Sequence, residues 1–95
     1  MLFEKTAIVT GAASGIGYAV AQALRQEGAQ VVMADVNEAL LIESARELGG
    51  VPFVGNLTRR EDCRRLVEFT VERFGGVDTV SYTHLRAHET LANLV

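Results

Sequence analysis

Cysteine and proline are scarce in this chain, and their scarcity narrows the class of protein. A single cysteine, Cys63, stands among 95 residues, so neither a disulfide framework nor a cysteine-rich metal site can form. This usage is typical of a reducing compartment, and we expect a cytoplasmic protein in which Cys63 is an ordinary helix residue. The single proline, Pro52, cannot donate to a strand ladder, so the segment around it is expected at a sheet edge.

Long apolar runs and an excess of basic charge are also missing. The apolar runs are far shorter than the ~20 residues of a membrane span, and residues 1–5 lack the basic start and long apolar core of a signal peptide. Nine basic and twelve acidic side chains give a net charge of −3. The chain therefore lacks the excess of positive charge that is typical of proteins that bind nucleic acid or anionic lipid. We therefore expect no membrane and no nucleic-acid partner, but a small molecule or another protein.

Short β-branched runs alternate along the chain with stretches of helical periodicity. Strands are expected at 6–10, 31–34, 51–54 and from 77, and helices at 15–28, 37–49 and 58–75. Such alternation with short connections implies right-handed crossovers and a parallel sheet with helices on both faces. The sequence predicts a truncated α/β fold, a Rossmann-like doubly wound parallel sheet (β-α-β-α-β-α-β) with strand order 3-2-1-4, which places Pro52 at the edge.

Several residues mark the expected helix ends. Asn37 is a suitable N-cap for the second helix, and Gly28 stands where a left-handed cap would end the first. Thr58 and Glu61 form a Thr-x-x-Glu capping box, which predicts that the third helix begins there.

A glycine-rich segment, Thr10-Gly-Ala-Ala-Ser-Gly-Ile-Gly17, joins the first expected strand to the first expected helix. Gly11 suits a tight turn, Gly15 leaves the backbone bare enough for a pyrophosphate, and Gly17 allows the helix to pack closely on the strand. The free N–H groups in the first turn of the expected helix, that of Ile16 among them, favour an anion. Ser14 adds a hydroxyl donor. A plain strand-to-helix turn is the alternative, because a glycine motif alone is weak evidence.

An acidic residue at the end of the second expected strand strengthens the nucleotide interpretation. Asp35 lies 18 residues after Gly17, where a carboxylate can accept hydrogen bonds from an adenosine ribose. It favours NAD over NADP, because a 2′-phosphate would meet a like charge and neither Val36 nor Asn37 supplies a cation. A simple turn residue is the alternative for Asp35.

The segment from Thr10 to Gly17 resembles the TGxxxGxG signature of the classical short-chain dehydrogenase/reductase family, and the similarity extends from Lys5 to Asp78. The resemblance implies hydride transfer between an alcohol or ketone and a nicotinamide ring, with NAD as the cofactor here. It also implies that the full-length parent is a homotetramer. In the family an Asp-Leu or Asp-Val pair after the third strand holds the adenine. Asn56 and Leu57 match that pair, and the Asn56 amide oxygen can accept a bond from the adenine amino group.

The family's catalytic set has no match in this chain. The family uses a Tyr-x-x-x-Lys motif and a substrate-orienting Ser, whereas Tyr18 is followed at the fourth position by Gln22 and Tyr82 by Arg86. We therefore expect a cofactor-binding portion that is catalytically incomplete, with substrate binding only to the full-length parent. The alternative is a non-catalytic dinucleotide-binding sensor or regulator of the same fold.

The similarity to the family ends at Thr79 or Val80. His84 and His88 then stand four residues apart with Glu89 beside them, superficially like a zinc-binding helix, but a catalytic site would need a third ligand and a general base at a suitable spacing. Residues 80–90 instead resemble one reading frame of a transposon-end adapter used in DNA sequencing libraries. We expect residues 1–79 to be the N-terminal part of a dinucleotide-binding Rossmann domain and 80–95 an adapter-derived, non-native tail. Codons at positions 80 to 95 that do not spell the adapter would overturn this expectation.

Overall fold

Helices and strands alternate through residues 4–81, the part of the chain that the structure, a computed structural model, describes. In chain order they are β1 (Thr6–Thr10), α1 (Gly15–Gln26), β2 (Gln30–Asp35), α2 (Glu38–Leu48), β3 (Val51–Val54), α3 (Arg60–Phe74) and β4 (Thr79–Ser81). The strands pair in parallel in the order β3-β2-β1-β4, which confirms the predicted Rossmann-like fold and strand order. The expectations for Tyr82, His84 and His88, and for the tail beyond Ser81, lie outside the described residues.

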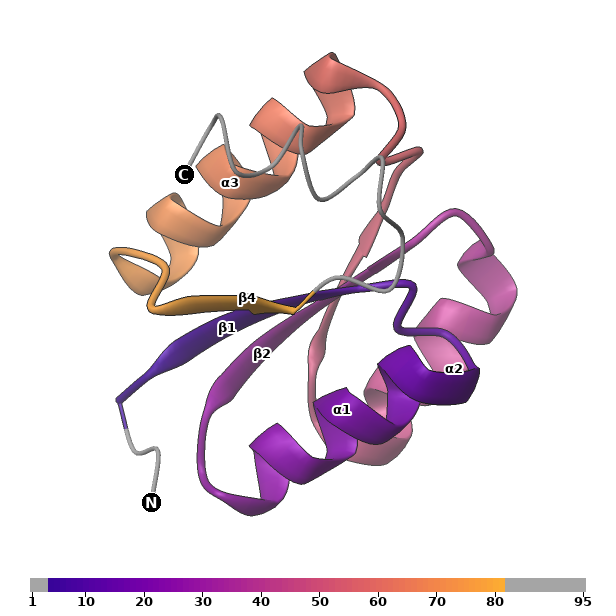
Figure 1. Cartoon of the computed structure of the whole chain (residues 1–95), viewed down its shortest axis with the longest axis vertical. Coiled ribbons are helices and arrows are strands. Elements are labelled where there is room, and N and C mark those ends of the chain that lie inside the picture. The colour runs from indigo at the N-terminus through magenta and orange to yellow at the C-terminus, as the bar shows by residue number, and fades with distance from the viewer. Residues whose placement is uncertain (1–3, 82–95) are drawn as a thin grey trace.

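The two faces of the sheet are covered by different helices. Helices α1 and α2 lie on one face and α3 on the other (Figure 1). Every residue of β1 is buried, and successive side chains of a strand point to opposite faces. Ala7 and Val9 accordingly pack toward α1 and α2, whereas Ile8 packs toward α3. This burial on both faces explains why β1 is a continuous apolar and β-branched run instead of an alternating one.

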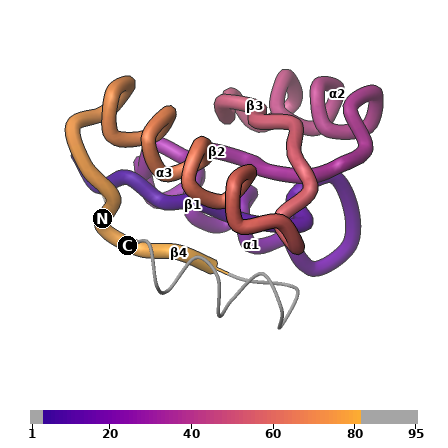
Figure 2. The backbone as a smooth tube through the Cα atoms, turned by 90° about the horizontal axis from the view of Figure 1, so that it is seen from above, coloured from indigo at the N-terminus to yellow at the C-terminus, as the bar shows by residue number. Residues whose placement is uncertain are grey.

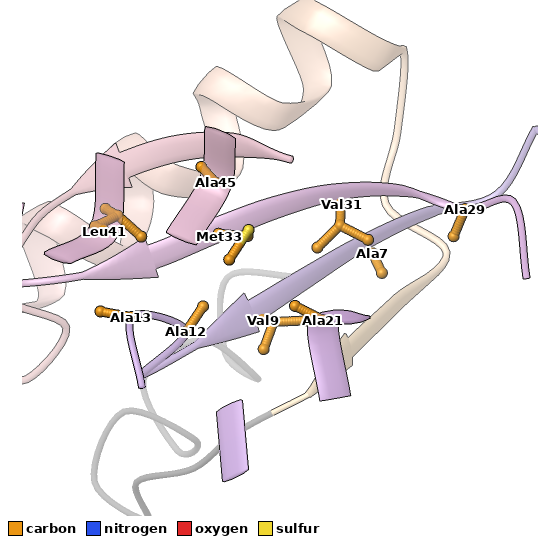
Figure 3. Close-up of a cluster of buried hydrophobic side chains, with 10 residues drawn as sticks. All are labelled: Ala7, Val9, Ala12, Ala13, Ala21, Ala29, Val31, Met33, Leu41 and Ala45. Carbon is orange, nitrogen blue, oxygen red and sulfur yellow. The ribbon is translucent and has the colours of Figure 1, made fainter. Parts of the chain in front are cut away.

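The core between the sheet and the α1–α2 layer consists mostly of small and branched side chains (Figure 3). It contains Ala7, Val9, Ala12, Ala13, Ala21, Ala29, Val31, Met33, Leu41 and Ala45. The many alanines let the helices approach the sheet closely. Two of them, Ala12 and Ala13, belong to the glycine-rich loop, so this loop is part of the packed core.

Pro52 lies on the edge strand β3, as predicted. Within residues 4–81, β3 pairs with β2 alone, and Pro52 stands opposite Met33. Figure 2 shows β3 and β4 on opposite sides of β2 and β1. Because β3 is an edge strand, the backbone N–H that proline lacks does not remove a hydrogen bond from the middle of the sheet.

The predicted helix ends are confirmed at two places and wrong at one. Asn37 caps α2 by accepting a hydrogen bond from the Leu40 N–H at 3.2 Å, and Gly28 follows α1 with φ +97°. The capping box of Thr58 and Glu61 does not form. The Thr58 hydroxyl donates instead to the Asn56 side-chain oxygen, at 2.6 Å, and α3 begins at Arg60 without a side-chain cap.

Strand β4 begins two residues later than predicted, at Thr79. Asp78 stands before it and forms two bonds with the start of β1: its Oδ2 accepts from the Thr6 N–H at 2.8 Å, and its own N–H donates to the Thr6 carbonyl at 2.9 Å. These bonds set the parallel register of Ala7 opposite Thr79. Within residues 4–81, no helix has the length and apolar content that crossing a membrane requires.

Candidate functional site

The carboxyl-terminal ends of three strands, and the loops that follow them, lie side by side at one end of the sheet. Because the strands are parallel, the carboxyl ends of β1, β2 and β3 share that end. The Ala12 N–H donates to the Ala34 carbonyl at 3.1 Å, and the Gly55 N–H donates to the Asp35 carbonyl at 3.0 Å. These two bonds hold the loops after β1 and β3 beside the end of β2.

Gly17 packs closely against the turn after β1. A Cβ atom added to it would lie 2.1 Å from the carbonyl oxygen of Gly11 and 3.0 Å from that of Thr10. Both are backbone atoms that cannot move aside without reshaping the loop. Helix α1 therefore rests directly on the turn after β1, which is the role that the sequence predicts for this glycine.

The first turn of α1 is open and carries unmatched donors. Ser14 is exposed and occupies the N-cap position without forming a side-chain capping bond, so its hydroxyl is available. Gly15 has φ +63°, and a Cβ atom there would meet nothing within 4 Å. Ile16 is 77% exposed. A helix N-terminus with free N–H groups, no acidic residue in its first turn and clear space above it suits a phosphate group.

Side chains from β2 and α2 fix the backbone of the glycine-rich loop at Ala13. The Ala13 N–H donates to Asp35 Oδ2 at 3.0 Å, and the hydroxyl of Ser44, buried in α2, donates to the Ala13 carbonyl at 2.9 Å. Sequence reasoning missed Ser44, because a single serine inside a helix gives no signal of what it will contact. The donor and acceptor of Ala13 are both satisfied, so the loop is preorganised before any ligand arrives.

Asp35 lies half-buried between the glycine loop and the start of α2. Its Oδ1 accepts from the N–H groups of Val36, at 2.7 Å, and Asn37, at 3.3 Å. An ionised carboxylate offers about four acceptor positions, and Ala13, Val36 and Asn37 use three. The carboxylate therefore retains acceptor capacity for a hydroxyl group at this edge of the sheet.

Asn56 and Leu57 are placed beside this edge, but their groups differ in availability. The Leu57 side chain is 7% exposed and packs with Ile8 and Leu66, so only its backbone can face a ligand. The Asn56 side-chain oxygen accepts from the Thr58 N–H, at 3.1 Å, and from the Thr58 hydroxyl, at 2.6 Å. The oxygen that was expected to meet the adenine amino group is thus already engaged within the loop.

The reactive-looking residues near the site are structural. Cys63 is buried, its Sγ–H donates to the Leu57 carbonyl at 3.2 Å, and burial raises the pKa of its thiol. The Tyr18 hydroxyl donates to Glu47 at 3.1 Å, a bond that raises the pKa of the phenol. Neither group is prepared to lose a proton near neutral pH. Among residues 4–81, no three His, Cys, Asp or Glu side chains come together to hold a metal ion.

The glycine loop, the acid at the end of β2 and the strand order agree with a comparison of the whole sequence to protein families. Residues 5–83 match the model of the short chain dehydrogenase family. The chain belongs to this family. The match covers the complete described sheet and all of the candidate site residues.

Curated relatives of this short-chain dehydrogenase chain carry several enzyme names. It is 37% identical over 82 residues to a diacetyl reductase ((S)-acetoin forming) of Staphylococcus epidermidis, covering 81% of this chain and 32% of that protein. It is 40% identical over 78 residues to zerumbone synthase of Zingiber zerumbet (78% and 29%), and 46% identical over 77 residues to L-fucose dehydrogenase of Oryctolagus cuniculus (80% and 27%). The chain thus spans roughly a third or less of the length of these relatives.

Proposed function

We propose that this chain is the N-terminal cofactor-binding portion of an NAD-dependent short-chain oxidoreductase, which passes hydride between an alcohol or ketone and a nicotinamide ring. The observation that carries the proposal is the bond between Asp35 and the Ala13 N–H. It sets a carboxylate beside an open helix N-terminus, as a dinucleotide requires. Family membership and relatives named as a reductase and a dehydrogenase support the reaction class.

Each part of the site has a separate task in binding. The Ser14 hydroxyl and the N–H groups of Gly15, Ile16 and Gly17 would hold the pyrophosphate, and Gly11 forms the turn that aims them. Asp35 would accept from the adenosine ribose, and the loop at Asn56 and Leu57 would face the base. The dinucleotide supplies the hydride-carrying ring, and the residues of this chain bind and orient it.

We also propose that the chain is catalytically incomplete by itself. No Tyr-x-x-x-Lys motif occurs in its 95 residues, because the single lysine is Lys5. The general acid, the substrate pocket and the contacts that make the parent a homotetramer would be supplied by other parts of the parent protein, which we place in the cytoplasm. Residues 80–95 remain, in this proposal, an adapter-derived tail that adds nothing to the site.

Titration of the chain with NADH and NADPH tests the cofactor assignment. We expect weak binding of NADH and, because like charges repel across the contact, binding of NADPH that is weaker by about tenfold or more. Asp35→Asn removes the charge and keeps the shape, so the two affinities should approach each other. Ligand-detected NMR measures both values even when binding is weak.

Asp78→Asn is the matched control. Asp78 also accepts a backbone N–H bond, from Thr6, but at the opposite edge of the sheet, so its replacement should leave the ratio of the two affinities unchanged. Tighter binding of NADPH than of NADH, or a ratio that Asp35→Asn does not alter, contradicts the assignment of NAD.

A further inference from the structure

Two buried hydroxyl groups inside helices of this chain have partners of different kinds. Thr70, in α3, donates to the Leu66 carbonyl four residues before it, at 2.8 Å. This is a common bond for a serine or threonine within a helix. Ser44, in α2, donates instead to the Ala13 carbonyl, 31 residues away in the glycine-rich loop, at 2.9 Å. The hydroxyl of Ser44 therefore serves the loop and not its own helix.

The Ser44 bond fixes the direction of one carbonyl group. Ala13 and Ser44 are each only 6% exposed, so a carbonyl that meets the Ser44 hydroxyl points into the core. The neighbouring peptide group is held separately, because the Ala13 N–H donates to Asp35 Oδ2. Of the two peptide groups that flank Ala13, one is thus held by β2 and the other by α2.

The direction of the Ala13 carbonyl matters because α1 begins directly after it. Ser14, Gly15 and Ile16 are exposed and form the open first turn, where free N–H groups attract an anion. A carbonyl oxygen carries a partial negative charge, and on this side of the loop it would repel a phosphate group. The loop has room for such a rotation, since a Cβ atom at Gly15 would meet nothing within 4 Å.

Without the Ser44 hydroxyl, the buried Ala13 carbonyl would lose its partner. A buried acceptor without a hydrogen bond is costly, and rotation toward water would relieve the cost. The bond from Asp35 does not prevent this rotation, because it holds the other peptide group.

We propose that Ser44 is a positioning residue for dinucleotide binding. Its hydroxyl keeps the Ala13 carbonyl in the core, so that the glycine-rich loop presents hydrogen-bond donors and no acceptor to the diphosphate. The inference rests on the proposed function and adds to it a residue of α2 that lies outside the glycine motif and makes no contact with the ligand itself.

Titration with NADH, followed by ligand-detected NMR, tests this role. Ser44→Ala removes the hydroxyl, and we expect its affinity for NADH to be about fivefold to tenfold lower, the effect of one lost hydrogen bond. Ser44→Thr keeps a hydroxyl at the same position, so it should restore most of the affinity. Recovery by the second variant separates the role of the hydroxyl from a general loosening of α2.

Thr70→Val is the matched control. It also removes one buried hydroxyl that donates to a backbone carbonyl, but in α3, on the other face of the sheet (Figure 1). It should lower the stability of the chain as Ser44→Ala does, and leave the affinity for NADH unchanged.

The carbonyl carbon signal of Ala13 gives a direct measurement. In the unaltered chain, NADH should shift the amide signals of Gly15 and Ile16 and leave the Ala13 carbonyl signal in place. The signal should move in Ser44→Ala, because the carbonyl loses its bond, and should return in Ser44→Thr. The measurement on the unaltered chain keeps the test decisive if Ser44→Ala does not fold.

The outcomes separate the two proposals. An unchanged affinity in Ser44→Ala, no recovery in Ser44→Thr, or an equal loss in Thr70→Val overturns the role of Ser44 while dinucleotide binding stands. An Ala13 carbonyl signal that NADH shifts as strongly as the Gly15 and Ile16 amide signals also overturns it. Failure of the folded, unaltered chain to bind NADH contradicts the proposed function itself, and the inference falls with it.

Discussion

Gly17 is a residue at which the fold leaves no room for a side chain. Gly17→Ala would place a methyl group 2.1 Å from the Gly11 oxygen and 2.6 Å from its carbonyl carbon. We expect a loss of about 2–3 kcal/mol in the free energy of unfolding, because overpacking against backbone forces the loop to move. Urea unfolding followed by circular dichroism measures the change.

Gly76→Ala is the control for that prediction. A Cβ atom at Gly76 meets nothing within 4 Å, and its φ is not in the positive range. This replacement should change the unfolding free energy by less than about 0.5 kcal/mol, or stabilise slightly by restricting the unfolded chain. Equal effects of the two replacements would show that the close approach of α1 to the turn is not what makes glycine necessary.

The roles of some site residues can be predicted from the sequence, and those of others cannot. The roles of Gly17 and Asp35 depend on spacing from a strand and a helix, which the sequence displays. The state of Asn56 depends on Thr58, two residues away, which the capping-box pattern assigned to the helix instead. A hydroxyl has one proton to donate, and here the Asn56 oxygen receives it.

At the scale of elements, the side chain of Arg25 connects the ends of α1 and α2 with the residue before β2. From the last turn of α1, its Nε donates to the Leu48 carbonyl at 3.0 Å and its Nη1 donates to the Ala29 carbonyl at 2.8 Å. These carbonyls lie at the end of α2 and just before β2. Arg25→Met should lower the unfolding free energy by about 2–3 kcal/mol, since two charge-assisted bonds to partly buried carbonyls are lost.

Arg46→Met provides the comparison for Arg25. Arg46 also lies in the last turn of a helix, α2, but it is exposed. Its loss removes a favourable charge at a helix C-terminus, an effect of about 0.3–1 kcal/mol. Thermal unfolding of the two variants side by side measures the difference, and a loss in Arg46→Met as large as in Arg25→Met contradicts the bridging role.

The ends of the elements were less predictable than their existence. The apolar periodicity of α3 is evident in the sequence. The residue at which α3 begins depends instead on the hydrogen-bond partners of Thr58 and Asp62. Asp62, in the first turn of α3, accepts from the Asn56 N–H. An acidic residue at this position is expected from the helix dipole alone, so the sequence gives no sign that it also positions the loop.

At the scale of the whole molecule, the two middle strands are the best protected. β1 has a partner on both sides, and β2 lies between β1 and β3. Ile8, Val9, Val32 and Met33 are fully buried, whereas β4 contains no buried residue. Native-state hydrogen exchange should therefore be slower in β1 and β2 than in β3 and β4, by about tenfold or more.

Amide exchange followed by NMR resolves this pattern strand by strand. The β3 amides serve as the internal control, because β3 is an edge strand like β4 but has four paired residues in place of three. Protection of β4 amides equal to that of β1 would contradict the description of β4 as a weakly held edge. It would indicate that residues beyond Ser81 or a second molecule cover it.

The sequence by itself determined the class of fold, the strand order and the position of the glycine loop. These depend on local features: the period of the apolar residues, the N–H donor that Pro52 lacks, and the spacing from Gly17 to Asp35. Only the tertiary structure decided which hydrogen-bonding groups of the site remain available. Ser44 reaches Ala13 across 31 residues, and Asp35 reaches it across 22. Such contacts exist only once α2 and β2 have packed around the loop, so no local pattern encodes them.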